Sequence, residues 1–146
     1  MKRLGVTFAF ACAALAFAAP GQAATKVGVA DDLPVGQPDG GAASFALMND
    51  VGLKEVRLSV LWDSTQPTTI ANKAQIEAVL PVATLRGVNV VLSVAPLKAR
   101  SITAPGANAQ CVAFLDQVAR TFPTVKNIIV GNEPNQPRFW QPQFDS

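Results

Sequence analysis

Short apolar runs and longer mixed segments follow one another along the chain after residue 24. The apolar runs are Lys26–Ala30, Val56–Leu61, Val88–Val94 and Asn127–Gly131. Runs of this length that are rich in β-branched residues are typical of strands. The third run is apolar over most of its length, as expected of a strand that is covered on both faces in a parallel sheet. The pattern therefore predicts four strands.

The segments between these runs carry apolar residues at helical spacing. They predict helices over Ala42–Asn49, over Ala71–Arg86 and from Asn108 to Phe122. We expect Asn108 to cap the third helix, because its side chain can accept a hydrogen bond from the first turn. Pro81 lies inside the second helix, where a proline removes a hydrogen bond and usually produces a kink. Strict alternation of strands and helices predicts right-handed βαβ units and a parallel sheet.

Two α/β architectures combine such units: an open doubly wound sheet and a (β/α)8 TIM barrel. A complete barrel takes about 250 residues, whereas this chain has 146. An isolated four-stranded parallel sheet would leave unpaired backbone groups along its edges. We therefore expect residues 24–146 to form the N-terminal half of a (β/α)8 barrel. It would be a truncated reading frame or half of an assembly that self-associates through the open sheet edge.

The N-terminus has the three parts of a secretory signal peptide. Met1–Arg3 is basic, Leu4–Ala19 is almost wholly apolar, and Pro20–Ala23 ends in small residues. The apolar part is shorter than the about 20 residues that a membrane-spanning helix requires. The sequence thus predicts a signal peptide over residues 1–23 that is removed on export. It also predicts a secreted or periplasmic protein with no membrane association after cleavage.

Composition narrows the possible chemistry. The chain has 12 Lys and Arg against 10 Asp and Glu. Lys2 and Arg3 of the signal peptide account for the excess, so no nucleic-acid partner is expected. The sequence has no histidine, which excludes Ser-His-Asp catalysis and histidine-based zinc sites in this chain. No glycine-rich phosphate-binding motif follows a strand, and we expect neither a cofactor nor a metal. Cys111 is the only cysteine after the signal peptide, and we expect it either to pair with a residue outside the chain or to be buried.

Polar residues follow the last predicted strand directly. Asn132 and Glu133 come after the apolar residues Ile128–Val130. Parallel α/β folds build their active sites at the carboxyl ends of the strands. We expect Pro134 to keep Glu133 extended, because the residue before a proline is biased toward extended backbone. The carboxylate and the amide are therefore the first candidates for a functional site.

The segment Gly131-Asn132-Glu133-Pro134 is similar to the fourth-strand signature of clan-A glycoside hydrolases. This group of (β/α)8 barrels includes cellulase-like and xylosidase-like retaining β-glycosidases. The resemblance implies that Glu133 is the general acid/base, which protonates the glycosidic oxygen and later activates water. It also implies that Asn132 binds the sugar hydroxyl next to the reacting carbon. The expected partner is thus a carbohydrate, either a polysaccharide or a glycoside.

The second predicted strand adds to this resemblance. The segment Val56–Trp62 is similar to the family's second strand, in which an arginine holds the nucleophile carboxylate. Arg57 would have that role, and Trp62 would stack on a sugar ring. From the residues alone, Arg57 could equally form a surface or inter-strand ion pair. For Trp62 and Trp140, packing is the more common role of a tryptophan and sugar stacking the less common one, since large aromatic side chains dominate the energetics of cores.

The resemblance also implies what these four strands lack. A retaining glycosidase needs two carboxyl groups about 5–5.5 Å apart, and in this family the nucleophile is a glutamate on the seventh strand. We therefore expect the chain alone to be inactive. Two alternatives stay open: a non-catalytic carbohydrate-binding or scaffold protein derived from the same barrel, and an unrelated small secreted α/β domain. In a glycosidase, Asp31 and Asp32 after the first strand would contact sugar hydroxyls or cap the loop.

Overall fold

The computed structural model describes residues 25–142, so the predicted signal peptide lies outside the described part. Strands and helices alternate there as the sequence predicts, with one short 3-10 helix before the third helix. No helix within these residues is long and apolar enough to cross a membrane. The elements are β1 (Gly28–Ala30), α1 (Ala42–Asp50), β2 (Glu55–Trp62), α2 (Lys73–Leu85), β3 (Asn89–Pro96), η1 (Ser101–Thr103), α3 (Ala107–Thr121) and β4 (Asn127–Val130).

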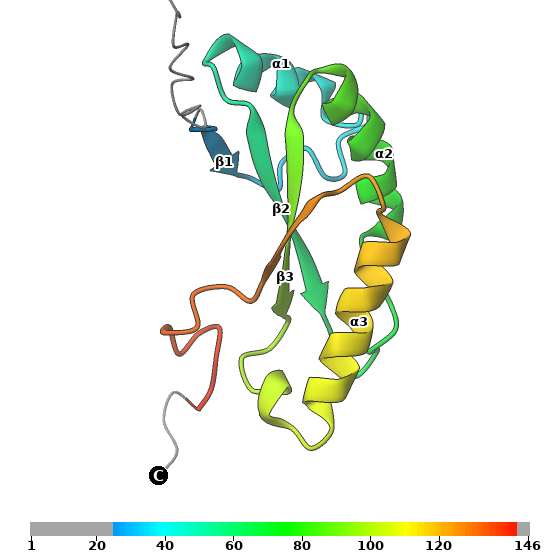
Figure 1. The fold of residues 1–146 in the computed structure, drawn as a ribbon, viewed down its shortest axis with the longest axis vertical. Helices are drawn as coiled ribbons and strands as arrows, with labels where there is room; N and C mark the ends of the chain where they lie inside the picture. Colours follow the sequence, from blue (N-terminus) through cyan, green and yellow to red (C-terminus); the bar gives the residue numbers. More distant parts are fainter. Residues whose placement is uncertain (1–24, 143–146) are drawn as a thin grey trace, which may run out of the picture.

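The four strands form one parallel sheet in the order β1-β2-β3-β4. Figure 1 shows α1, α2 and α3 following one another along one side of this sheet. Right-handed crossovers give this arrangement when each new strand is added at the same edge, because every helix then falls on the same face. A doubly wound sheet has helices on both faces, and residues 25–142 do not show that arrangement. The predicted α/β fold with a parallel sheet is confirmed, and it is compatible with part of a (β/α)8 barrel.

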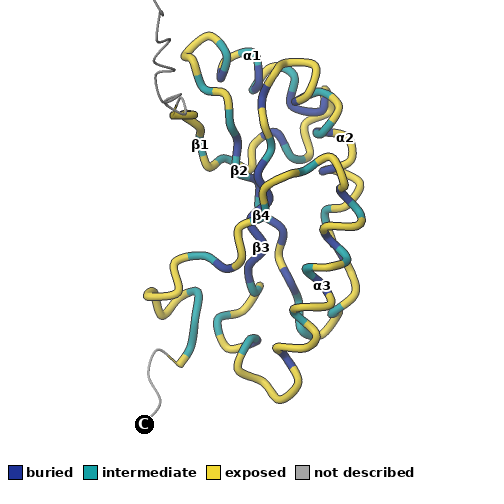
Figure 2. Tube along the Cα trace, viewed as in Figure 1, coloured by how far each residue is buried: buried dark blue, intermediate teal, exposed yellow. Residues whose placement is uncertain are grey.

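Alternate residues of β2 meet two different environments. In β2, the buried residues Val56, Leu58, Val60 and Trp62 alternate with less buried ones. The parallel register carries these two faces into the neighbouring strands, because side chains point to opposite faces in turn. In β3 both faces are buried from Val91 to Ala95, as the sequence predicts for a strand that is covered on both sides. The core lies between the helices and one face of the sheet, where Figure 2 shows most of the buried positions. The helices contribute Phe45, Met48, Ile76, Val79, Ala83, Phe114 and Val118 to it.

The other face of the sheet carries no helix within residues 25–142, and we call it the helix-free face. Its side chains are a mixture of small, polar and apolar groups. Leu61 and Ile129 are each 45% exposed there, whereas Val91, Ser93 and Ala95 are buried. Within residues 25–142 this face is therefore exposed at positions of β2 and β4 and buried along the middle of β3. The register assigns to it Gly28, Ala30, Glu55, Arg57, Ser59, Leu61, Asn89, Val91, Ser93, Ala95, Asn127 and Ile129.

Side chains complete the edge of β2 where β1 stops. The Asp32 carboxylate accepts a hydrogen bond from the Ser59 backbone N–H at 2.6 Å, and the Asn72 amide donates to the Ser59 carbonyl at 2.9 Å. Asp31 accepts from the Leu33 backbone N–H at 2.9 Å. The Asp32 and Asn72 side chains take the place of backbone groups that a longer β1 would supply. Asp31 thus caps its own loop, one of the two roles expected for this pair, whereas Asp32 caps the edge of β2.

Two details of the helices bear on the predictions. Helix α2 runs without a break through Pro81, at a position that is exposed to solvent. Asn108 does not cap α3, so that prediction was wrong. The helix starts at Ala107, directly after Gly106, whose φ of 77° turns the chain into the first turn. Asn108 therefore falls one residue inside the helix.

Candidate active site at the carboxyl edge of the sheet

A cleft of about 400 Å³ opens on the helix-free face at the carboxyl ends of β2, β3 and β4. Its walls come from the ends of β2 and β3 and from the segment after β4. Parallel sheets place their ligands at this edge, and the cleft includes two of the four predicted site residues. The lining residues are Arg57, Ser59, Leu61, Ser93, Ala95, Pro96, Leu97, Asn132, Arg138 and Phe139.

Arg57 connects the second strand to the residues after the fourth. Its Nη1 donates to Asn132 Oδ1 at 3.3 Å and to Ser93 Oγ at 3.2 Å. The Ser93 hydroxyl in turn donates to the Gly131 carbonyl at 3.5 Å. An arginine only donates, so the Asn132 amide must turn its oxygen toward Arg57. The two N–H donors of Asn132 Nδ2 then have no partner within residues 25–142.

No carboxylate neutralises Arg57 in the described part of the chain. The alternative of a surface or inter-strand ion pair is therefore wrong for residues 25–142. Both of its partners, Ser93 and Asn132, are neutral, and its Nε and Nη2 groups have no partner within these residues. A guanidinium of this kind suits a two-oxygen anion, because its planar fork matches carboxylate geometry.

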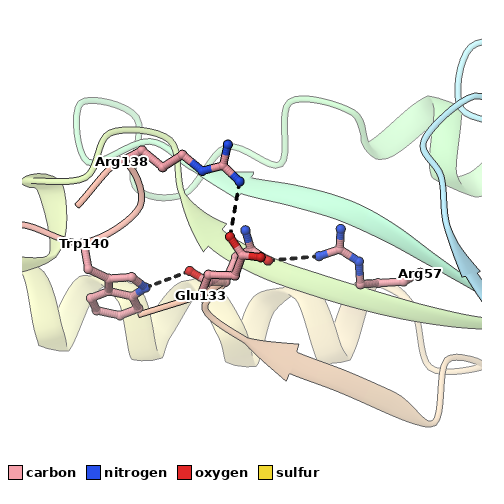
Figure 3. A network of polar contacts seen from close by, with 5 residues as sticks. Arg57, Glu133, Arg138 and Trp140 are labelled. Carbon is pink, nitrogen blue, oxygen red and sulfur yellow. Dashed lines mark hydrogen bonds and ion pairs between the residues drawn. The ribbon is translucent and has the colours of Figure 1, made fainter. Parts of the chain in front are cut away.

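Glu133 forms an ion pair at the mouth of the cleft. Its Oε2 lies 3.2 Å from Arg138 Nη2, with side chains 51% and 72% exposed. The Arg138 guanidinium also lies over the Phe139 ring, 4.4 Å from its centre. Figure 3 shows Arg138 above Glu133, with Arg57 and Trp140 on opposite sides of it. Exposed pairs contribute only about 0–1 kcal/mol, so a ligand can replace this contact at little cost.

The backbone at Glu133 differs from the prediction. Its φ is 38°, in the left-handed region, rather than the extended conformation expected before Pro134. The chain turns as soon as β4 ends: Gly131 has a φ of 83°, and the Gln136 N–H donates to the Glu133 carbonyl at 2.9 Å. A left-handed residue other than glycine costs about 1–3 kcal/mol and persists only where its surroundings hold it. The turn, rather than Pro134, sets the direction of the Glu133 side chain.

Trp140 packs against the beginning of this turn. Its Nε1 donates to the Asn132 carbonyl at 3.2 Å. A Cβ built on Gly131 would lie 2.9 Å from Trp140 Cζ2, so the ring covers Gly131 closely. These contacts make Trp140 a packing residue that lies directly beside the candidate site.

Trp62 is not at the site, which corrects its predicted role in sugar stacking. The side chain is completely buried in the core, and its Nε1 has no hydrogen-bond partner within residues 25–142. The reason is the two-residue alternation of a strand. Arg57 and Trp62 are an odd number of positions apart, so they point to opposite faces of β2. An arginine in the cleft therefore requires the tryptophan to pack against the helices.

The remaining acidic and nucleophilic groups do not extend the site. Hydrogen bonds from the backbone N–H and then the hydroxyl of Thr65 hold the pKa of Asp63 below its ordinary value, so Asp63 is a poor proton donor at neutral pH. Cys111 in α3 is free and half-buried, and burial raises the pKa of its thiol. Residues 25–142 contain no group of three or more His, Cys, Asp or Glu side chains that could hold a metal ion.

A second hollow, of about 290 Å³, lies at the opposite edge of the sheet. Lys26, Asn89, Lys126 and Asn127 are among the residues that line it, and no carboxylate contributes to its walls. Parallel α/β sheets bind their ligands at the carboxyl ends of the strands, which is the other edge. We therefore assign the candidate active site to the cleft beside Arg57 and Asn132.

Comparisons with protein-family models, with curated proteins and with solved structures give no match for this chain. The candidate site therefore depends on the chain's own geometry and on the sequence resemblance. Sequence reasoning missed Ser93 and Arg138 as members of the site. Ser93 could have been found, because the register places it on the same face as Arg57. Arg138 lies in an irregular loop, where no periodicity indicates which residues meet.

Proposed function

We propose that residues 24–146 are the N-terminal half of a (β/α)8 barrel from a secreted retaining glycoside hydrolase. Its substrate class is the O-glycosidic bond of a polysaccharide or glycoside, and Glu133 is the general acid/base. The sequential strand order and the single layer of helices support the barrel. Further strands added by the same right-handed crossovers would continue the sheet until its two edges meet. The signal-peptide pattern of residues 1–23 supports secretion.

The hydrogen bond between Arg57 and Asn132 carries the proposal. The two residues are 75 positions apart in the sequence, and their side-chain atoms lie 3.3 Å apart. The family resemblance assigns both of them to one active site for separate chemical reasons. Sequence periodicity contains no information about that contact, so the contact is independent support for the assignment.

The atoms that face the cleft suit the roles that the resemblance implies. Asn132 Oδ1 is engaged by Arg57, which directs the Nδ2 donors toward an acceptor such as a sugar hydroxyl. Glu133 follows directly, with a side chain that stays half-exposed. General acid catalysis needs a carboxyl within hydrogen-bond reach of the leaving oxygen, and the Glu133 side chain is open to such an approach.

The second carboxyl group comes from outside residues 25–142 in this proposal. A retaining mechanism needs it about 5–5.5 Å from Glu133. The free donors of Arg57 would hold that group once a later strand brings it into the cleft. With the nucleophile absent, a small carboxylate from solution can occupy the same position. This gives an assay for the acid/base half of the site.

The experiment uses phenyl β-glycosides of glucose, xylose, mannose and galactose, with formate added as the external nucleophile. Phenol is a poor leaving group, so its release depends on protonation by a general acid. We expect slow release of phenol that depends on the formate concentration. Replacement of Glu133 by Gln should reduce the rate by about 100-fold or more, in the range typical for loss of general acid catalysis.

Glu77→Gln is the matched control. Glu77 lies on the exposed side of α2 and pairs with Lys73, and its side chain is 51% exposed, the same fraction as that of Glu133. The control should keep the wild-type rate. Sugar binding without any formate-dependent turnover would favour the non-catalytic carbohydrate-binding alternative. A chain that neither binds oligosaccharides in calorimetry nor releases phenol would refute the proposal.

A further inference from the structure

The segment after β4 returns to the segment after β3 and forms hydrogen bonds with it. The Gln141 backbone N–H donates to the Ala99 carbonyl at 3.0 Å, and the Gln141 carbonyl accepts from Thr103 Oγ1 at 3.2 Å. The Gln141 side chain accepts from Arg100 Nε at 3.1 Å. These three contacts fix the residue that follows Trp140 against the neighbouring loop. The position of Trp140 is therefore set from outside the cleft.

Trp140 in turn contacts the beginning of the turn after β4. Its indole N–H holds the Asn132 carbonyl at 3.2 Å, and its ring lies so close to Gly131 that a Cβ there would approach Cζ2 to 2.9 Å. On the opposite side, Arg57 holds the Asn132 side chain at 3.3 Å. Trp140 therefore holds the Asn132 backbone, and Arg57 holds the Asn132 side-chain amide. The left-handed turn at Glu133 begins directly after Asn132.

We infer that Trp140 is a positioning residue for Asn132 and Glu133. It fixes the backbone from which both side chains reach the cleft, and it does so through one hydrogen bond and one close packing contact. Its indole N–H and ring are used by the protein, so it is not a stacking platform for sugar. The role in substrate binding rests on the proposed function, whereas the effect on Asn132 and Arg57 does not.

Trp140→Phe tests the inference, because it keeps an aromatic ring and removes the N–H donor. Trp62→Phe is the matched control: the two tryptophans are the only ones in the chain, and the Trp62 N–H has no partner within residues 25–142. The ¹⁵N-labelled chain is compared by NMR. We expect Trp140→Phe to shift the signals of the Asn132 amide groups and of the Arg57 guanidinium. Trp62→Phe should lower the thermal midpoint and leave these signals in place.

The second measurement is the affinity for xylo- and cello-oligosaccharides, read from the same spectra. Loss of the single hydrogen bond should weaken binding by about threefold to tenfold, the range expected for one neutral hydrogen bond. Unmoved Asn132 and Arg57 signals in Trp140→Phe would overturn the inference, and so would shifted signals with unchanged affinity. Shifted signals in a chain whose wild type neither binds oligosaccharides nor releases phenol would support the positioning of Asn132 and overturn the proposed function alone.

Discussion

Gly131 gives the sharpest test of how the site is built, because it has two separate reasons to be glycine. Its φ of 83° lies in the left-handed region, and its missing side chain leaves room for the Trp140 ring. Gly131→Ala violates both requirements at once. Gly52 has a φ of 81° and no atom within 4 Å of an added Cβ. Gly52→Ala is therefore a matched control that violates only the backbone requirement.

The two substitutions should differ by the energy of the Trp140 contact. A left-handed alanine costs about 1–2 kcal/mol relative to its ordinary conformation. An overpacked contact that forces neighbouring groups to move costs about 1–3 kcal/mol more. Each alanine also restricts the unfolded chain to a similar degree, so this effect cancels in the comparison. We expect Gly131→Ala to lower the free energy of unfolding by about 1–3 kcal/mol more than Gly52→Ala does.

Urea denaturation followed by circular dichroism measures both free energies of unfolding. The same pair of substitutions is then repeated in a Trp140→Ala background, as a double-mutant cycle. If the ring is the cause, the excess loss at Gly131 disappears there. Equal losses for Gly131→Ala and Gly52→Ala in the wild-type background would refute the reasoning, and so would an excess that survives the removal of Trp140.

Two further predictions concern titrating groups. Hydrogen bonds from the backbone N–H groups of Ala43 and Gly41 hold the pKa of Asp39 below its ordinary value. This stabilisation is present above about pH 4 and is lost as the pH falls through the lowered pKa. Asp39→Asn should therefore have a lower free energy of unfolding than wild type at pH 7, and the difference should disappear in acid. A difference in the free energy of unfolding that stays constant with pH would contradict this. Burial raises the pKa of the Cys111 thiol. Iodoacetamide should therefore alkylate Cys111 more slowly at pH 8 in the folded chain than in urea. Equal alkylation rates would argue against the burial of this thiol.

Local patterns predicted most of the fold. The β-branched run at Val88–Val94 identifies β3, because a strand that is buried on both faces is apolar along most of its length. The helical spacing around Ile76 and Val79 identifies α2, because burial on one face of a helix imposes a period on the sequence. The same alternation assigns Ser93 and Arg57 to one face of the sheet. Asn108 failed as a helix cap because the positive φ of Gly106 starts the helix earlier. Chain reversal at a glycine is a local conformational choice that side-chain periodicity does not record.

The sequence by itself determined the alternation of strands and helices, the faces of each strand and the presence of an amide and a carboxylate at the end of β4. These follow from interactions between neighbouring residues. Only the tertiary structure decided that Arg57 meets Asn132 across 75 positions, that Trp140 returns to cover Gly131, and that Glu133 adopts a left-handed turn. The first depends on a contact between distant segments of the chain, and the other two depend on the irregular segment that follows β4. Hydrophobic periodicity specifies neither which distant group a residue will touch nor how an irregular segment turns.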